Sequence, residues 1–166
     1  MEAEGVSVIN LEDRIEQAWK SAETAFYRLI LVIGAPNAGK TKALTRFGQR
    51  LQSPVVNLNL TLSRQLLELS GDERSLSASA VLAGLGEEKG GIVIFDNTEI
   101  LFDRALALDP LRLLHGLSRS QVVLASWAGA MSQGRLIYAA PGHPEHRVYK
   151  NVEAVTIDLS QGDRAE

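Results

Sequence analysis

The sequence predicts a three-layer α/β fold with a mainly parallel central sheet. Residues 34–41 read Gly-Ala-Pro-Asn-Ala-Gly-Lys-Thr, which matches the P-loop pattern G-x-x-x-x-G-K-[ST] at every position. The apolar run 29–33 leads directly into this loop, and a helical pattern follows over 42–51. A second apolar run, 92–95, ends in an acid, Asp96. Strands that alternate with helices in this way indicate βαβ units and a parallel sheet.

The elements are expected in the following order. A first helix follows Asn10, an N-cap residue with Asp13 three positions later. Its apolar stripe consists of Leu11, Ile15, Ala18, Trp19, Ala22 and Phe26. Strands are expected over 28–33, 55–58, 92–96, 121–125, 136–139 and 155–159. Further helices are expected over 42–51, 62–69, 75–85 and 103–117, with a break at Gly71-Asp72 and a kink or division at Pro110.

Composition narrows the class of protein. The chain has 166 residues, 45% hydrophobic and 22% charged, which suits one domain over 1–166 with flexible ends at 1–9 and 160–166. The absence of cysteine excludes disulfides, thiolate catalysis and Cys-ligated zinc. The start has no secretory pattern and no apolar run reaches 18 residues, so we expect a cytoplasmic protein outside the membrane. The net charge of −3 favours protein partners over nucleic acid and leaves direct DNA contact open.

The residue types of the loop follow from what a triphosphate needs. Gly34 and Gly39 let the backbone approach phosphate oxygens, and the following helix start supplies amide donors. Lys40 is expected to reach the β- and γ-phosphates, and the Thr41 hydroxyl to bind Mg²⁺. The ligands predicted are therefore ATP and Mg²⁺. The binding residues predicted in this segment are Gly34, Ala35, Pro36, Asn37, Ala38, Gly39, Lys40, Thr41 and Lys42.

The strand that ends in Asp96 is predicted to be the Walker B strand, whose carboxylate holds the Mg²⁺ together with Thr41. Many P-loop ATPases place Glu directly after this Asp, but here the position is Asn97 and an acid follows at Glu99. The stretch 96–101 is similar to the D-[DN]-x-[EW]-x-[LI] form of signalling-type (STAND) ATPases. Asn97 or Glu99 is expected to orient the attacking water. The alternative, that Glu99 is only a solvated acid at a helix start, stays open.

The remaining site expectations concern strand 121–125 and the arginines. Ser126 lies where P-loop ATPases often carry a polar residue that senses the γ-phosphate. The arginines that can act in a neighbouring subunit are Arg104, Arg119, Arg135 and Arg147. The expected core is ASCE- or AAA+-like, with an extra strand between the two nucleotide-binding strands. Too few residues follow the fourth strand for a helical lid, so coupling should come through subunit contacts in a homo-oligomer.

The chain resembles the BrxF-like P-loop proteins of type III BREX (bacteriophage exclusion) systems. The resemblance lies in the size with an early P-loop, the stretch Glu99-Ile100-Leu101-Phe102-Asp103 with Asp109-Pro110-Leu111-Arg112-Leu113-Leu114, and the loop at 141–147. It covers nearly the whole chain. It implies a bacterial cytoplasmic protein of anti-phage defence that works beside a DNA methyltransferase, a phosphatase-like protein and a large ATPase.

The leading hypothesis is an ATP-binding switch or assembly subunit with weak or partner-stimulated ATPase activity. A small-molecule kinase is the second hypothesis, although strand 55–58 ends in Asn57-Leu58-Asn59 without an acidic pair. A GTPase is disfavoured because the guanine-binding pattern Asn-Lys-x-Asp is absent. A structural subunit that binds nucleotide without turnover also remains, because Asn97 replaces the usual glutamate.

Overall fold

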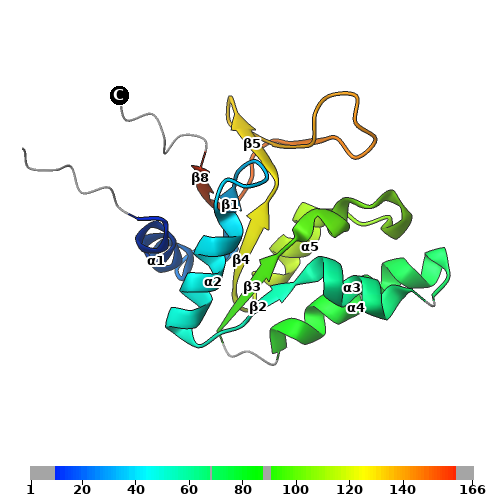
Figure 1. Cartoon of the computed structure of the whole chain (residues 1–166), viewed down its shortest axis with the longest axis horizontal. Helices are drawn as coiled ribbons and strands as arrows, with labels where there is room; N and C mark the ends of the chain where they lie inside the picture. Colours follow the sequence, from blue (N-terminus) through cyan, green and yellow to red (C-terminus); the bar gives the residue numbers. More distant parts are fainter. Residues whose placement is uncertain (1–9, 68, 88–90, 160–166) are drawn as a thin grey trace, which may run out of the picture.

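The computed structural model describes residues 10–67, 69–87 and 91–159, and it has a five-stranded parallel sheet at its centre (Figure 1). The strand order is β2-β3-β4-β1-β8, so β4 lies between β1 and β3 as the sequence predicts. The strands are β1 (Leu29–Ile33), β2 (Val55–Asn57), β3 (Ile92–Asp96), β4 (Val122–Trp127) and β8 (Val155–Asp158). The predicted α/β class is confirmed. The predicted flexible ends, 1–9 and 160–166, lie outside the described residues.

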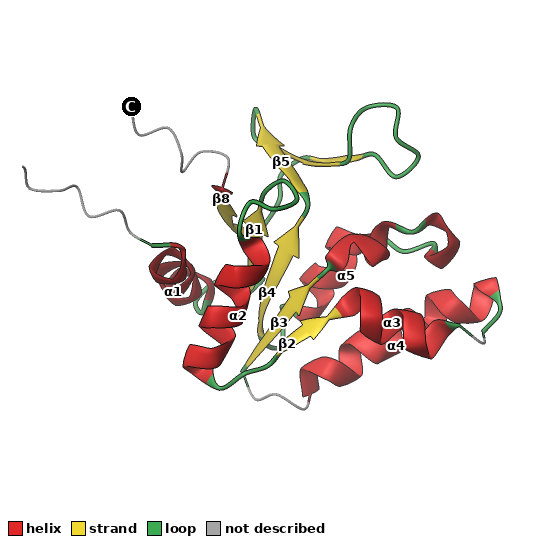
Figure 2. Cartoon of the chain, in the orientation of Figure 1, coloured by secondary structure: helices red, strands yellow, loops and turns green. Residues whose placement is uncertain are grey.

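Helices cover both faces of this sheet and complete the three layers (Figure 2). The helices are α1 (Leu11–Ala22), α2 (Lys40–Leu51), α3 (Leu58–Leu66), α4 (Gly71–Glu87) and α5 (Pro110–Leu117). α1 and α2 pack on one face, while α3, α4 and α5 contribute to the core on the other. Because both faces are covered, β1, β3 and β4 are buried along their whole length. No helix in the described ranges is long and apolar enough to cross a membrane.

The first helix begins as predicted and ends earlier. The Asn10 side chain accepts a hydrogen bond of 2.8 Å from the backbone N–H of Asp13, which confirms the cap. The helix ends at Ala22, and a turn in which the Ala25 N–H donates to the Ala22 carbonyl follows. The prediction that Phe26 belongs to the buried stripe is therefore wrong, since this turn leaves its side chain 68% exposed.

Side-chain caps explain the other shifted boundaries. Asn57 ends β2 and accepts from the Leu60 N–H at 3.0 Å, so α3 begins at Leu58 and the predicted strand loses its last residue. The predicted break at Gly71-Asp72 is instead the first turn of α4. Pro110 divides the predicted helix 103–117, because it occupies the first turn of α5. Two 3₁₀ segments precede it, η1 (Thr98–Phe102) and η2 (Arg104–Leu106).

A second, antiparallel sheet follows β4 and is not predicted as a unit. It consists of β5 (Gly129–Ser132), β6 (Arg135–Tyr138) and β7 (Arg147–Tyr149), in the order β5-β6-β7. Only β6 overlaps a predicted strand. An aromatic cluster joins this sheet to the rest of the molecule: Phe102 stacks on Tyr138 with ring centroids 3.4 Å apart, and Trp127 lies edge-on to both rings. The indole N–H of Trp127 donates to the Ile137 carbonyl at 3.1 Å.

Candidate functional site

The P-loop joins the carboxyl end of β1 to the start of α2. Asn37 and Gly39 adopt positive φ values of 66° and 96°, which turn the chain sharply into the helix. A Cβ at Gly34 would lie 3.1 Å from the Ala38 Cβ, closer than most side chains tolerate. The Gly34 N–H donates to the Trp127 carbonyl at 3.1 Å, which ties the loop to the end of β4. The strand, glycine loop and helix that the motif requires are all present.

Lys40 is folded back onto the loop. Its side chain lies in a position only 7% exposed, and its Nζ donates to the carbonyls of Gly34 and Ala35 at 2.6 and 2.7 Å. Burial lowers the pKa of Lys40, while the charges of Glu99 and then Asp96 raise it. The ammonium group therefore lies within electrostatic reach of both predicted acids, at the place where a triphosphate would bind.

Asp96 and Ser126 lie side by side at the carboxyl ends of β3 and β4. Phe95 pairs with Ala125, so the next residues on the two strands are neighbours. Because side chains alternate along a strand, Asp96 and Ser126 belong to the face that α2 covers, together with Ile94 and Leu124 two residues earlier. Asp96 is 5% exposed and Ser126 is fully buried. The Ser126 hydroxyl has no hydrogen-bond partner among the described residues, which is unusual for a buried polar atom.

The segment after Asp96 is fixed by a residue that the sequence did not single out. Asn97 has a left-handed conformation with φ 53°, and it starts η1. The buried Thr98 donates from Oγ1 to the Ser126 carbonyl at 2.6 Å. This bond holds η1 against the end of β4 and so positions Glu99. Thr98 occupies the unspecified third position of the D-[DN]-x-[EW] pattern, so no sequence signal pointed to it.

A cavity of about 530 Å³ connects these parts of the site. It is lined by Pro36, Asn37, Gly39, Lys40, Thr41, Lys42, Asp96, Asn97 and Glu99. The structure thus brings together the predicted catalytic residues and the predicted metal ligands in one hollow. They are Lys40, Asp96, Asn97 and Glu99 for catalysis, and Thr41 and Asp96 for the metal. Gly34, Ala35 and Ala38 form the rest of the loop, and Ser126 lies on the strand next to Asp96. Loop amides for phosphate and two oxygen ligands for Mg²⁺ are the groups that Mg-ATP needs.

The four candidate arginines lie in different parts of the molecule. Arg119 precedes β4, at the amino end of the sheet, while the P-loop lies at the carboxyl end. Six strand residues separate these two ends by about 20 Å, so Arg119 cannot reach the P-loop of its own chain. The Arg147 guanidinium lies 5.9 Å from the centre of the Phe102 ring, in the aromatic cluster. Arg104 and Arg135 are exposed.

Comparisons with known proteins add little to this picture. No protein-family model matches the chain, and no curated protein matches it. Among solved structures, the structure of C. elegans PCH-2 is similar with a TM-score of 0.44 and 21% sequence identity. The match covers 69% of this chain and 36% of that chain. What supports the fold and the candidate site is therefore this chain's own strand order, loop geometry and cavity.

Proposed function

We propose that this chain binds Mg-ATP between the P-loop and the end of β3, and that it is a switch or assembly subunit with slow or partner-stimulated ATPase activity. The observation that supports this proposal most is the cavity in which Lys40, Thr41, Asp96 and Glu99 meet beside the loop amides. These groups match, in type and placement, the cation, metal ligands and acid that P-loop ATPases use.

Each residue has a distinct role in this proposal. The loop amides and the start of α2 bind the phosphates, and Lys40 leaves the Gly34 and Ala35 carbonyls to contact the β- and γ-oxygens. Thr41 and Asp96 would hold a Mg²⁺ ion, which would neutralise phosphate charge. Glu99 or Asn97 orients the attacking water. Glu99 is exposed and lines the cavity, and its charge raises the pKa of Lys40 against the larger effect of burial.

Replacing Asp96 by asparagine should remove the Mg²⁺ dependence of ATP binding while the fold is kept. The asparagine has the same shape and keeps an oxygen, but it lacks the charge that attracts a hard cation. ATP affinity measured by titration calorimetry with Mg²⁺ or with EDTA should differ in the wild type and be equal in the variant. Circular dichroism and cooperative melting should match the wild type. If the variant fails to fold, and if the wild type binds ATP equally well with and without Mg²⁺, the assignment of Asp96 to a Walker B strand is wrong.

The biological setting of the proposal rests on the resemblance to BrxF-like proteins. It supports a cytoplasmic role in a bacterial anti-phage assembly whose other members are a large ATPase, a methyltransferase and a phosphatase-like protein. A small-molecule kinase is less well supported, because Asn57 at the end of β2 caps α3 and supplies no acid. Binding without turnover is the remaining alternative. ATP hydrolysis measured with and without the partner proteins and DNA distinguishes a stimulated ATPase from a silent nucleotide-binding subunit.

The open site predicts activity that depends on assembly. A γ-phosphate in the cavity would need a cation from a second subunit, and such arginines accelerate hydrolysis about 10³–10⁵-fold where they operate. The candidates for this cation that lie away from the amino end of the sheet are Arg104, Arg135 and Arg147. Arg119 lies at the amino end, so it can supply the cation only if the amino end of one subunit's sheet meets the carboxyl end of its neighbour's. ATPase activity per molecule should rise with protein concentration. Light scattering with a non-hydrolysable ATP analogue should show a mass well above 18.0 kDa. A strict monomer with constant specific activity would contradict this prediction.

A further inference from the structure

A second cavity, of about 470 Å³, lies along α5 and shares no lining residue with the cavity beside the P-loop. Its walls come from the segment between α1 and β1, from α5 and its N-cap, from the turn before β4 and from β7. The lining residues are Tyr27, Asp109, Leu111, Arg112, His115, Gly116, Arg119 and Tyr149. Of these residues only Arg119 appears in the proposal above, as one of four arginines that could act at the ATP site of a neighbouring subunit.

Aromatic rings gather at one side of this cavity, where Tyr27 and His115 line it and Phe26 lies beside them, outside the lining. Tyr27 lies 4.6 Å from the His115 ring at an angle of 36°, and the edge of Phe26 meets Tyr27 at 4.8 Å. The Arg119 guanidinium covers Phe26 at 5.2 Å from the ring centre. Phe26 is nevertheless 68% exposed, although large aromatic side chains are usually buried. The rings thus present a stacking surface to solvent beside a cation.

Three arginines lie in or beside this cavity. Arg112 and Arg119 line it, and Arg28 donates from its guanidinium to the Arg119 carbonyl at 3.1 Å. Within the described ranges, none of these three arginines forms a salt bridge. Asp109 is the one acid of the lining, and its carboxylate accepts from the Arg112 backbone N–H as the cap of α5. The cavity is therefore locally cationic in a chain of net charge −3.

We propose that this cavity binds a short stretch of single-stranded nucleic acid. Arginine-rich hollows with exposed aromatic faces bind single strands, because each base can stack on a ring while phosphates contact the cations. A base would stack on the free face of Phe26, since Arg119 covers the other, and phosphates would lie over Arg28, Arg112 and Arg119. A duplex keeps its bases stacked inside and does not offer these faces. The proposal is independent of the ATP site.

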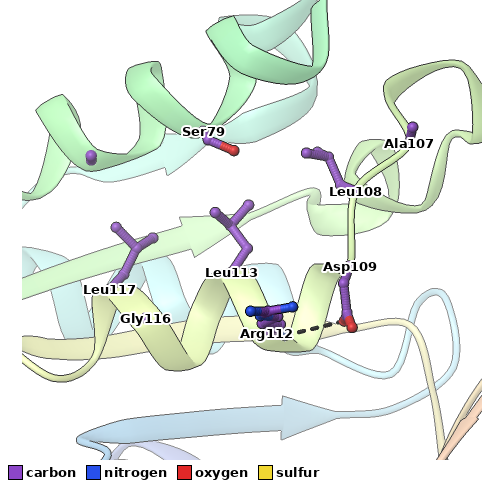
Figure 3. Close-up of a pocket in the computed structure, with 9 residues that line it drawn as sticks. Ser79, Ala107, Leu108, Asp109, Arg112, Leu113, Gly116 and Leu117 are labelled. Carbon is purple, nitrogen blue, oxygen red and sulfur yellow. Dashed lines mark hydrogen bonds between the residues drawn. The ribbon is translucent and has the colours of Figure 1, made fainter.

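The neighbouring cavity sets a limit to the proposed site. It measures about 630 Å³, lies between α4 and α5, and shares Asp109, Arg112 and Gly116 with the cationic cavity (Figure 3). Figure 3 shows Leu113 and Leu117 of α5 directed toward α4. Leu108 lies to the right of them in this view. These apolar walls offer neither an aromatic face nor a further cation. We therefore confine the nucleic-acid site to the side of Arg112 that faces Tyr27 and His115.

Binding of a fluorescein-labelled 12-nucleotide oligo-dT, measured by fluorescence anisotropy at several salt concentrations, tests the proposal. If three phosphates are neutralised, the logarithm of the binding constant should fall with that of salt concentration with a slope of about −2. Phe26→Ala should weaken binding roughly tenfold, and Phe26→Trp should retain it. Arg119→Gln should weaken binding and reduce the slope by about 0.7. Free dTMP and inorganic phosphate should compete only at far higher concentration.

Matched variants separate a specific site from general effects. Leu67→Ala removes another exposed apolar side chain, 74% exposed and directly after α3, and Arg64→Gln removes an exposed charge of α3; neither residue lines the cavity, and both variants should bind like the wild type. Lys40→Ala should also bind the oligonucleotide normally, so failure of the ATP proposal does not affect this result. Absent binding at low salt, or binding that Phe26→Ala and Arg119→Gln leave unchanged, would overturn the proposal. Equal competition by free dTMP would assign the cavity to free nucleotides instead.

Discussion

Replacing Lys40 by alanine should weaken the binding of Mg-ATP at least tenfold. The Nζ now bonds two neutral carbonyls inside the loop, and phosphate oxygens would replace them with charged partners. Charged hydrogen bonds contribute about 1.5–3 kcal/mol each, which corresponds to a factor of about 10 or more in affinity. For the wild type, ATP at about 100 times its dissociation constant should stabilise the fold by roughly 2.7 kcal/mol, seen as a higher melting temperature. At the same concentration a variant that binds ten times more weakly should keep only about 1.4 kcal/mol of this stabilisation, and therefore about half of the shift.

Lys20→Ala is the control for this measurement, since Lys20 is exposed in the last turn of α1 and remote from the loop. It should show the full wild-type shift. The melting temperature of each unliganded variant separates a loss of binding from a loss of stability. Equal shifts in the wild type and in Lys40→Ala would refute the proposal that the P-loop binds the nucleotide.

Replacing Gly129 by alanine should destabilise the protein by about 3 kcal/mol, at the upper end of the usual cost of overpacking. A Cβ at this position would lie 1.9 Å from the Ile137 carbonyl oxygen and 2.9 Å from the indole nitrogen of Trp127. Neither group can move easily, because the same carbonyl accepts the indole N–H. The paired strands β5 and β6 would have to separate. Chemical denaturation followed by circular dichroism measures the change in the free energy of unfolding.

Gly84→Ala provides the opposite control. Gly84 lies inside α4, and a Cβ there meets nothing within 4 Å. This change should stabilise the protein by about 0.5–1 kcal/mol, because alanine favours the helix more than glycine does. If both variants unfold like the wild type, the close approach of β5 to β6 is not what holds the second sheet in place.

The central sheet and the P-loop site were accessible from sequence because their signals are local. β1 and β3 are continuous apolar runs, as buried parallel strands require, and each leads directly into a residue of the site, Gly34 or Asn97. The loop motif fixes its own conformation through its glycines. Asp96 and Ser126 come together because the carboxyl ends of neighbouring parallel strands share one edge.

The parts that sequence reasoning missed depend on contacts between distant residues. β5 and β7 are short, and their position is set by the packing of Phe102, Trp127 and Tyr138. Phe26 is exposed because α1 ends at Ala22. The helical spacing of apolar residues continues to Phe26 and therefore does not indicate this end. The cationic cavity and the side chains beside it bring residues 26–28 next to 112–119, more than 80 positions away. Only the folded chain reveals that an acidic protein has a local surface of positive charge.

Trp127 gives the molecule an internal optical reporter. Its carbonyl accepts the first amide of the P-loop, its ring touches the residue that ends η1, and its indole N–H is bonded to β6. The chain has one other tryptophan, Trp19, which packs against Phe47 on the opposite face of the sheet. With Trp19 changed to phenylalanine, all indole emission comes from the point where the P-loop, the segment after Asp96 and the antiparallel sheet meet. Events at the proposed nucleotide site can then be followed in real time, without an attached dye, in the wavelength and lifetime of one side chain's fluorescence.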